Sequence, residues 1–206
     1  MRALAIVMVL AGVAHAGDTA CERATCFAIQ LHVAAVADAP VVSAEWTAAQ
    51  LAAANRLFAA LDVGFTVAGS DADSAAHLRT REDRSALGAH VNGAVIHVFV
   101  TGTLENVDDP DEPVYGVTWR KGTRKFVILA ANARDIVLAH ELGHVFGLPH
   151  STYAISIMNK TKRATPPIDE RRFADEELAA MRAMVRRLLR TKVLDNVRYD
   201  ERDDRR

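Results

Sequence analysis

Three histidines in the C-terminal half of the chain have the spacing of a metal site. His140, His144 and His150 lie within one short run of the sequence. Residues four apart project from the same face of a helix, so His140 and His144 can bind one ion from adjacent turns. Imidazole is a good ligand for Zn²⁺, and a catalytic zinc takes three protein ligands and leaves one position open. The spacing therefore predicts a zinc site with His150 as the third ligand.

Gly147 and Glu141 complete this pattern. Glycine readily adopts a positive φ, so Gly147 can end the helix sharply and let the chain return His150 to the metal. Glu141 is not needed as a ligand, and a carboxylate beside the metal can accept a proton from its bound water. A bare HExxH is also consistent with a surface His pair and a solvated Glu. The longer HExxHxxGxxH is much harder to reach by chance, so we favour the zinc site.

The extended motif and a methionine that follows it resemble the metzincin clan of zinc endopeptidases. Met158 stands in Ser156-Ile157-Met158-Asn159, a short step after His150. That short step is most similar to the matrixin (matrix metalloproteinase-like) branch. The resemblance implies that Met158 forms an apolar floor beneath the three ligands without binding the metal. Position 160 is Lys, whereas some branches, such as the astacins, have Tyr there, so those branches fit less well.

The resemblance implies an α+β zincin fold, with a twisted mixed sheet of about five strands. It adds a packing helix, an active-site helix and a C-terminal helix. Apolar alternation predicts the strands, which are 27–36, 63–67, 95–101, 114–119 and 126–130. Helical stripes predict a packing helix from Ser43 to Leu61, the zinc helix, and a long helix from Asp175.

The strand 114–119 is expected to form a hairpin with 126–130 through the Lys121-Gly122 turn. The resemblance places this strand at the sheet edge along the cleft. An edge strand has free N–H and C=O groups, so an extended peptide can pair with it. The implied activity is hydrolysis of internal peptide bonds in extended polypeptides, with Glu141 as general base.

Local patterns also predict the helix caps and the positions of two further histidines. Asn132, with Asp135 as its partner, is expected to cap the zinc helix, and Asp175 the last helix. His32 lies on the opposite face of its strand from the apolar set, which predicts a surface or second-layer position. His97 shares a face with apolar neighbours, which predicts a buried and hydrogen-bonded ring.

Composition is that of an ordinary globular protein. The chain has 206 residues, of which 50% are hydrophobic and 25% charged, with a net charge of −1. This charge gives no electrostatic reason to expect nucleic acid or an anionic membrane as a partner. The resemblance implies a protein or peptide substrate instead. We expect one metalloprotease domain over residues 17–206, with a subdomain boundary near 147. Residues 198–206 are almost all charged and are expected to fray.

Residues 1–16 have the pattern of an export signal. Arg2 precedes a short apolar run from Ala3 to Val13, and Ala14-His15-Ala16 is a small-x-small cleavage site. This predicts a secreted or periplasmic protein with no membrane association in its mature form. In an oxidising compartment Cys21 and Cys26 would form a small-loop disulfide. A cysteine that caps the zinc in a latent form is the alternative, but the surrounding residues do not match the matrixin switch.

Other metals and other functions stay open at this point. Matrixins carry a structural zinc and calcium bound by His and Asp, but the spacing of Asp73, His77 and His90 does not reproduce that set, and we favour solvated loop residues. The loop 105–112 could hold Ca²⁺ without having the EF-hand spacing. Its candidate ligands are Asp108, Asp109, Asp111 and Glu112.

Two alternative hypotheses about the function stand beside the endopeptidase. In the first, a different zinc hydrolase takes a downstream Glu as its third ligand. The candidates are Glu170, Glu176 and Glu177. That reading leaves Gly147 and His150 unexplained. The second rival is a secreted zinc-binding module without proteolytic activity, and the presence of Glu141 disfavours it.

Overall fold

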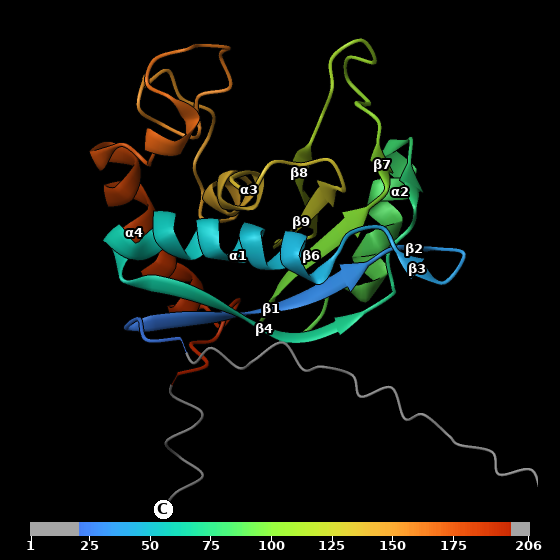
Figure 1. Cartoon of the computed structure of the whole chain (residues 1–206). Coiled ribbons are helices and arrows are strands. Elements are labelled where there is room, and N and C mark those ends of the chain that lie inside the picture. Colours follow the sequence, from blue (N-terminus) through green and yellow to red (C-terminus); the bar gives the residue numbers. More distant parts are fainter. Residues whose placement is uncertain (1–20, 199–206) are drawn as a thin grey trace, which may run out of the picture.

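The computed structural model describes residues 21–198, and its centre is a five-stranded sheet in the order β4-β1-β6-β9-β8. The strands are β1 (Thr25–Val33), β4 (Val63–Asp71), β6 (Ile96–Thr101), β8 (Gly116–Lys121) and β9 (Arg124–Ala130). Neighbouring strands pair in parallel except β8, which is antiparallel to β9 and lies at the edge (Figure 1). The mixed sheet, the hairpin and the edge position of the strand are therefore confirmed.

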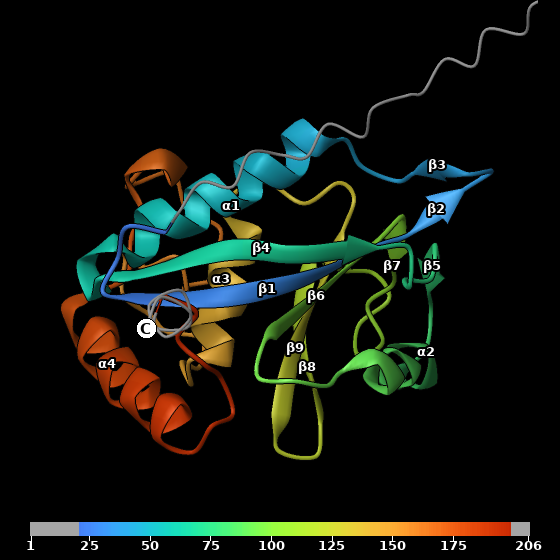
Figure 2. The same ribbon diagram turned by 90° about the horizontal axis from the view of Figure 1, so that it is seen from below.

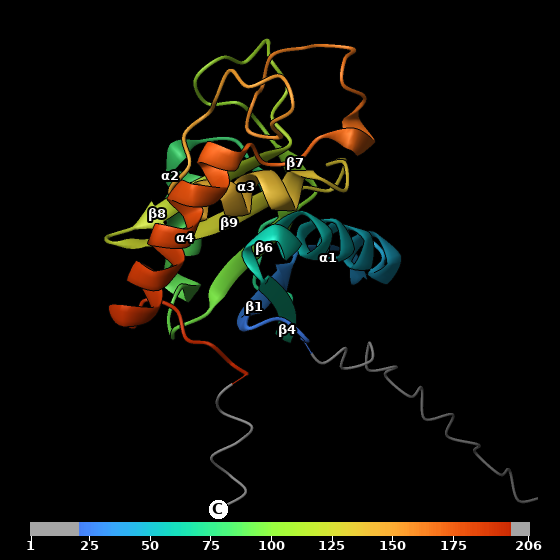
Figure 3. The ribbon, with the colours of Figure 1, turned by 90° about the vertical axis from the view of Figure 1, so that its left-hand side faces the viewer.

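One face of the sheet carries the two helices that flank the large core. These are α1 (Ala44–Phe58), continued by the 3₁₀ turn η1 (Ala59–Leu61), and α3 (Val137–Val145). The C-terminal helix α4 (Asp175–Arg190) packs across the end of this layer beside α3 (Figure 3). Aromatic rings join the layers, with Phe58 5.0 Å from both Phe65 of β4 and Phe173 before α4, measured between ring centroids. Burial of this cluster fixes the helices on the sheet.

The other face of the sheet carries a smaller apolar cluster around Phe99 and Phe126. It is covered by α2 (Arg81–Ala86) and the 3₁₀ turn η2 (Leu87–His90), which Figure 2 shows at the end of the sheet away from α4. Two short strand pairs flank the sheet, β2 (Ala35–Val36) with β3 (Ala39–Pro40) and β5 (His77–Leu78) with β7 (Thr103–Leu104). A last 3₁₀ turn, η3 (Ile168–Glu170), precedes α4.

Strand pairing moves the predicted strand boundaries. The edge strand begins at Gly116 rather than 114 and runs to Lys121, because its polar end pairs with Arg124 across the turn. Strand β4 runs on to Asp71, because that residue pairs with His32 of β1. Backbone pairing extends strands through polar residues that carry no apolar alternation, so the pattern alone ends them too early.

The predicted cap of the zinc helix is wrong. Helix α3 begins at Val137, and its N-cap Ile136 makes no side-chain cap hydrogen bond. Gln50 of α1 supplies the partner instead, because its Oε1 accepts from the backbone N–H of Leu138 at 3.0 Å. Its amide nitrogen also donates to the carbonyl of Arg134 at 3.0 Å. A buried residue from another helix has replaced the local cap, which a search for Asn132 and its neighbours cannot find.

The cap of the last helix also differs from the prediction. Asp175 is the first residue of α4, and the N-cap position is Ala174. Glu177 accepts a hydrogen bond from the N–H of Ala174 at 2.8 Å, which satisfies a donor at the helix start. By contrast, Ser43, where the packing helix is expected to begin, caps α1 by accepting from the N–H of Trp46 at 3.2 Å.

The two predicted histidine environments have different outcomes. His97 is buried and hydrogen-bonded, as expected. His32 is also buried, with 3% of its surface exposed, so of the two predicted alternatives, surface or second layer, the surface position is wrong. On that face the His32 ring packs beside Phe99 of the neighbouring strand β6, with ring centroids 4.3 Å apart, and the ring centroid of His90 of η2 lies 6.0 Å from it. The sheet is therefore buried on both faces at this point.

Both ends of the described range, residues 21 and 198, lie near β1. Cys21 and Cys26 form the expected disulfide. Arg198, where the predicted tail begins, donates to the carbonyl of Arg23 at 2.7 Å, and residues 199–206 lie outside the described range. The predicted export signal, residues 1–16, lies outside it as well. Among the helices of residues 21–198, none combines the length and apolar character needed to cross a bilayer.

Candidate metal centre and cleft

The three predicted histidines converge on one point. His140 and His144 project from α3, and His150 lies in the segment that follows it. Their ring centroids are 4.8 to 5.3 Å apart, and one nitrogen from each ring lies within 4.8 Å of the others. Ligand atoms on a tetrahedral zinc are about 3.3 Å apart, so small rotations of the rings bring them to a shared ion.

Backbone carbonyls fix the orientation of the first two rings. Nδ1 of His140 lies 2.7 Å from the carbonyl oxygen of Ile157, and Nδ1 of His144 lies 2.7 Å from that of Leu148. A carbonyl only accepts, so each ring carries its proton on Nδ1 and leaves Nε2 free for a metal. The arrangement is that of metal-ligating histidines held by their second nitrogen.

Burial keeps these rings neutral. It lowers the pKa of His140 to about 4, against the opposing effect of the hydrogen bond to Ile157. Burial also lowers the pKa of His144 and of His150. A neutral imidazole is the form that binds a metal, so the donor set fits Zn²⁺ without a further proton to remove.

Gly147 makes the turn that returns His150. Its φ is +92°, in the region that favours glycine, and it follows the end of α3 directly. The N–H of Leu148 then bonds to the carbonyl of Gly143 at 2.9 Å, which closes the helix end. The sharp turn predicted from the sequence is present.

Met158 lies directly beneath the helix that carries the ligands. It is fully buried, and a Cβ added to Gly143 would lie 2.6 Å from its sulfur. Only glycine at position 143 permits this approach. The N–H of Ser151 donates to the carbonyl of Met158 at 3.2 Å, so the turn around Met158 also positions the segment that leads from His150.

A buried polar network that lies under the Met158 turn was not predicted from the sequence. The Ser156 hydroxyl lies 2.7 Å from Oε2 of Glu177 and accepts from the N–H of Met158 at 2.8 Å. Glu177 is 5% exposed and belongs to α4. This network ties the C-terminal helix to the turn that carries the Ile157 carbonyl, and therefore to the ring of His140. A Glu in the first turn of a helix usually interacts with the helix dipole, so the sequence pattern does not indicate that Glu177 bonds to Ser156.

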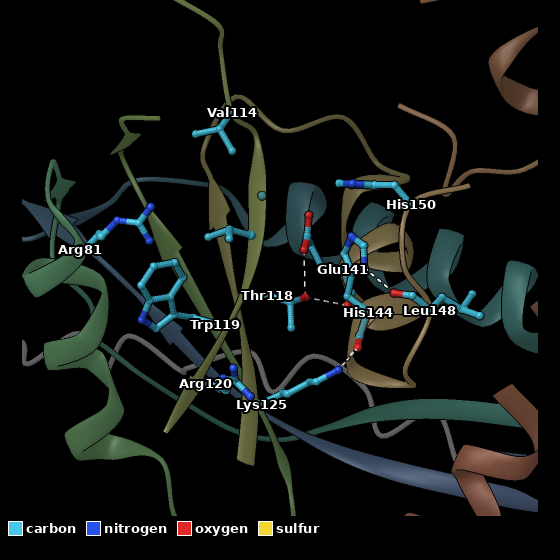
Figure 4. Close-up of a pocket in the computed structure, with 12 residues that line it drawn as sticks. Arg81, Val114, Thr118, Trp119, Arg120, Lys125, Glu141, His144, Leu148 and His150 are labelled. Carbon is cyan, nitrogen blue, oxygen red and sulfur yellow. Dashed lines mark hydrogen bonds between the residues drawn. The ribbon is translucent and has the colours of Figure 1, made fainter. Parts of the chain in front are cut away.

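Glu141 is a buried carboxylate facing the edge strand. It is 4% exposed, and burial raises its pKa to about 7, against the opposing hydrogen bond from Thr118. The hydroxyl of Thr118 lies 2.9 Å from Oε2 of Glu141 and 2.8 Å from the Glu141 carbonyl oxygen (Figure 4). Thr118 was not singled out in the sequence, because the strand pattern alone does not say what its hydroxyl reaches.

His144, His150 and Glu141 line a cleft of about 730 Å³ whose opposite wall is β8. Figure 4 shows Val114 toward one end of this wall and Trp119 and Arg120 toward the other. The cleft residues also include Arg81 and Lys125, which line it beside Trp119. The arrangement combines a metal-ligand set, a carboxylate near neutral pKa and a free strand edge in one space.

The other acidic candidates do not join the three histidines. Glu177 bonds to Ser156 and Ala174, and Glu170 and Glu176 do not belong to the histidine cluster. Within residues 21–198, the loop 105–112 forms no group of three metal-ligating side chains, and its Asp108 pairs with Arg81. His77 bonds to Thr103, whereas Asp73 joins a second cluster with His32 and Asp71.

Comparisons with known proteins agree with this architecture. The family model described as matrixin (Peptidase_M10) matches residues 64–184, more than half of the chain. No curated protein sequence shows significant similarity. Among solved structures, metalloproteinase-II from Bacteroides fragilis superposes with a TM-score of 0.55 at 14% identity, covering 78% of this chain and 53% of that one. Our chain thus spans about half the length of the Bacteroides protein.

A second solved structure is similar over nearly its whole length. Archaemetzincin from Methanopyrus kandleri superposes with a TM-score of 0.52 at 11% identity, covering 79% of this chain and 96% of that one. At such identities the two likenesses show a shared metzincin-like fold. The family match includes the histidines, Glu141 and Met158, and it shows that this chain belongs to the matrixin family.

Proposed function

We propose that this chain is an exported zinc-dependent endopeptidase that hydrolyses internal peptide bonds of extended polypeptides. One observation carries the proposal. A buried carboxylate, Glu141, lies beside three converging histidines and across a cleft from the free edge of β8. Membership of the matrixin family supports the same reaction.

His140, His144 and His150 would hold the zinc ion through ring nitrogens. When bound, the ion supplies Lewis acidity for the scissile carbonyl and lowers the pKa of the attacking water. The carbonyls of Ile157 and Leu148 hold two of the rings in the ligating orientation. Met158 would support them from below without ligating.

Glu141 would act as the general base and then as the acid. Its carboxylate takes a proton from the attacking water and later delivers it to the amine that leaves when the C–N bond breaks. A pKa of about 7 suits both steps, because the group can be unprotonated before attack and protonated before departure. Thr118 holds one carboxylate oxygen, which leaves the other to face the reactants.

The edge strand would bind the substrate. On its far side β8 pairs with β9, whereas its cleft side has no strand partner among the described residues. A peptide in extended form can add there through backbone hydrogen bonds. Pairing through the backbone selects for extended polypeptides and leaves side-chain preference to the residues that line the cleft.

Export is proposed from the first residues of the sequence. The charged Arg2, the short apolar run and the Ala14-His15-Ala16 site support cleavage after Ala16. The Cys21–Cys26 disulfide is compatible with an oxidising destination. N-terminal sequencing of protein recovered outside the cytoplasm should begin at Gly17, and an intact Met1 there would contradict this part of the proposal.

The activity is tested by digesting a proteome-derived peptide library with purified protein and reading the products by mass spectrometry. We expect internal cleavage that stops with a zinc chelator and with Glu141→Ala. Glu176→Ala is the matched control, since it removes an exposed carboxylate from α4. If wild type and Glu141→Ala cut equally little while both hold zinc, the chain is a zinc-binding module and the proposal is wrong.

A further inference from the structure

A second group of metal-binding side chains lies on the opposite face of the sheet from α3. It consists of His32 on β1, Asp71 at the end of β4, Asp73 just beyond it and His90 at the end of η2, which we call the β1–β4 cluster. One ligand atom from each of the first three lies within 4.8 Å of the others. His90 lies outside this group of three, but its Nδ1 is 3.4 Å from a carboxylate oxygen of Asp73, so it borders the same site.

The ring of His32 is buried and held by a chain of hydrogen bonds. Its Nε2 lies 2.9 Å from Nδ1 of His97, and Nε2 of His97 lies 2.8 Å from the carbonyl oxygen of Asn92. A carbonyl only accepts, so His97 carries its proton on Nε2 and accepts on Nδ1. A longer contact of 3.2 Å from the Asn92 N–H competes for the same nitrogen, and the shorter contact decides the tautomer.

This chain determines what His32 presents to the cluster. Because His97 accepts, His32 donates from Nε2, and a neutral His32 then turns the lone pair of Nδ1 toward Asp71. That nitrogen is 2.6 Å from Oδ1 of Asp71. Two lone pairs at this distance repel each other, so a proton on Nδ1 or a metal cation must lie between the two atoms. Two carboxylates and neutral imidazoles together match the charge of a divalent ion.

Asp71 is also oriented in advance. Gln30 of β1 donates to its Oδ2 at 3.0 Å, and the N–H of Asp73 donates to its Oδ1 at 3.0 Å. Metal-ligating carboxylates and histidines are characteristically held by such outer hydrogen bonds. Gln30 does this for Asp71, and His97 does it for His32.

We propose that His32, Asp71, Asp73 and His90 bind a second Zn²⁺ ion with a structural role. Two imidazoles and two carboxylates form a four-ligand set that suits tetrahedral zinc, whereas calcium takes six to eight oxygens. Ligand atoms on such an ion are about 3.3 Å apart. This value lies between the 2.6 Å that separates His32 Nδ1 from Asp71 Oδ1 and the 4.8 Å limit within which the ligand atoms of His32, Asp71 and Asp73 lie. Asp73 and His90 are exposed and free to close the remaining distance.

The ion would fasten the connection between β4 and β6 to the sheet. That connection, residues 72–95, carries α2. The guanidinium carbons of Arg81 and Arg84 in α2 lie 5.9 and 5.2 Å from the ring centroid of Trp119, at one end of the cleft. The second zinc would therefore stabilise the cleft wall without entering the reaction.

The test is the zinc content of the full chain by mass spectrometry after loading with ZnCl₂ and dialysis against metal-free buffer. We expect about two equivalents in the wild type and about one in the His140→Ala/His144→Ala double variant. Asp71→Asn should also hold about one, and the combination none. His77→Ala is the matched control, because His77 bonds to Thr103 outside the cluster, and it should keep both ions.

Two further variants and a second measurement cover a failure of Asp71→Asn to fold. Asp73→Asn and His90→Ala change exposed side chains and should each lose the cluster zinc while the fold is kept. In the metal-stripped triad double variant, ZnCl₂ should raise Tm by about 5 °C and CaCl₂ should not. The proposal is wrong if the double variant holds no zinc, or if Asp71→Asn and His90→Ala keep the wild-type content. A different result is that the wild type binds one zinc, which is lost in Asp71→Asn and kept in His140→Ala/His144→Ala. That result would support the cluster site and contradict only the proposed endopeptidase.

Discussion

The triad of His140, His144 and His150 and the β1–β4 cluster are built in opposite ways. The triad comes from one helix and the turn that follows it, within eleven residues of sequence. The cluster takes its members from β1, the end of β4 and η2, and strand register places His32 opposite Asp71. Local spacing encodes the first site, whereas the second exists only once two strands have paired in the right register.

The surroundings of the two sites separate chemistry from structure. His144 and His150 of the triad line a cleft of about 730 Å³, with the buried carboxylate of Glu141 beside them. In the cluster the His32 ring stacks on Phe99, with ring centroids 4.3 Å apart, and both carboxylates are occupied by hydrogen bonds or close contacts within the cluster. A metal in the first site would meet a substrate in the cleft, whereas a metal in the second would lie outside the cleft and join segments of the fold.

Removing the exposed histidine from each site gives the largest expected effect. His150→Ala should lower kcat/KM by about 10³-fold, because the ion supplies several kcal/mol of transition-state stabilisation. His90→Ala should leave kcat/KM within about threefold, since its site lies outside the cleft. Peptide hydrolysis and zinc content are measured on the same samples. Full activity and zinc retention in His150→Ala would show that another residue, such as a downstream Glu, is the third ligand.

The metal-free triad should also show two opposed titrations. The pKa of His140 falls to about 4 on folding, so its contribution to stability is present above pH 6.5 and is lost as pH falls toward 4. The pKa of Glu141 rises to about 7, so its contribution is present below pH 4.5 and is lost as pH rises through 7. Between pH 4.5 and pH 6.5 the two changes in the free energy of unfolding nearly cancel.

Glu141→Gln should expose the histidine titration. Relative to wild type, the metal-free variant should lose roughly 3 kcal/mol of unfolding free energy on going from pH 7 to pH 4.5. Urea denaturation in a chelator at both pH values measures this difference, with Glu176→Gln as the exposed control. An identical pH dependence in wild type and Glu141→Gln would mean that Glu141 is not desolvated as described.

Gly143→Ala should disturb the triad alone, by an intermediate amount. The new Cβ would lie 2.6 Å from the Met158 sulfur, so the floor must move, at a cost of about 2 kcal/mol. Zinc should then be held less tightly at the triad and unchanged at the cluster. Gly88→Ala is the control, because its Cβ would lie 3.4 Å from a flexible Lys121 side chain. Thermal unfolding and zinc titration would contradict the account if the two variants behaved alike.

The same contrast explains how far the sequence could predict this molecule. The zinc helix, Gly147 and Met158 were readable because helical spacing and a single turn depend on neighbours in the chain. The edge position of β8 followed from the family resemblance. Partners brought by the fold were not readable, and these include Gln50 capping α3, Glu177 bonding Ser156 and His32 meeting Asp71.

The misplacement of His32 has a definite physical cause. Alternation assigns a strand residue to one face and assumes that the other face meets water. β1 lies inside a largely parallel sheet that is covered on both faces, by α1 on one side and by η2 on the other. A polar residue on such a strand is buried with a partner, and the partner is set by register rather than by sequence neighbours.

The smallest effects should come from the residues that hold the two carboxylates. Thr118 holds Glu141 from β8, and Gln30 holds Asp71 from β1. Thr118→Val removes a hydrogen bond that lowers the pKa of Glu141, so the base stays protonated to higher pH and the acid limb of kcat/KM should move up. Gln30→Met leaves that limb in place and should weaken zinc binding at the cluster by about tenfold, the usual effect of an outer hydrogen bond. Each variant should leave the other site unchanged because the two carboxylates lie on opposite faces of the sheet. A shift of the pH profile in Gln30→Met, or a loss of cluster zinc in Thr118→Val, would show that the sheet couples the sites.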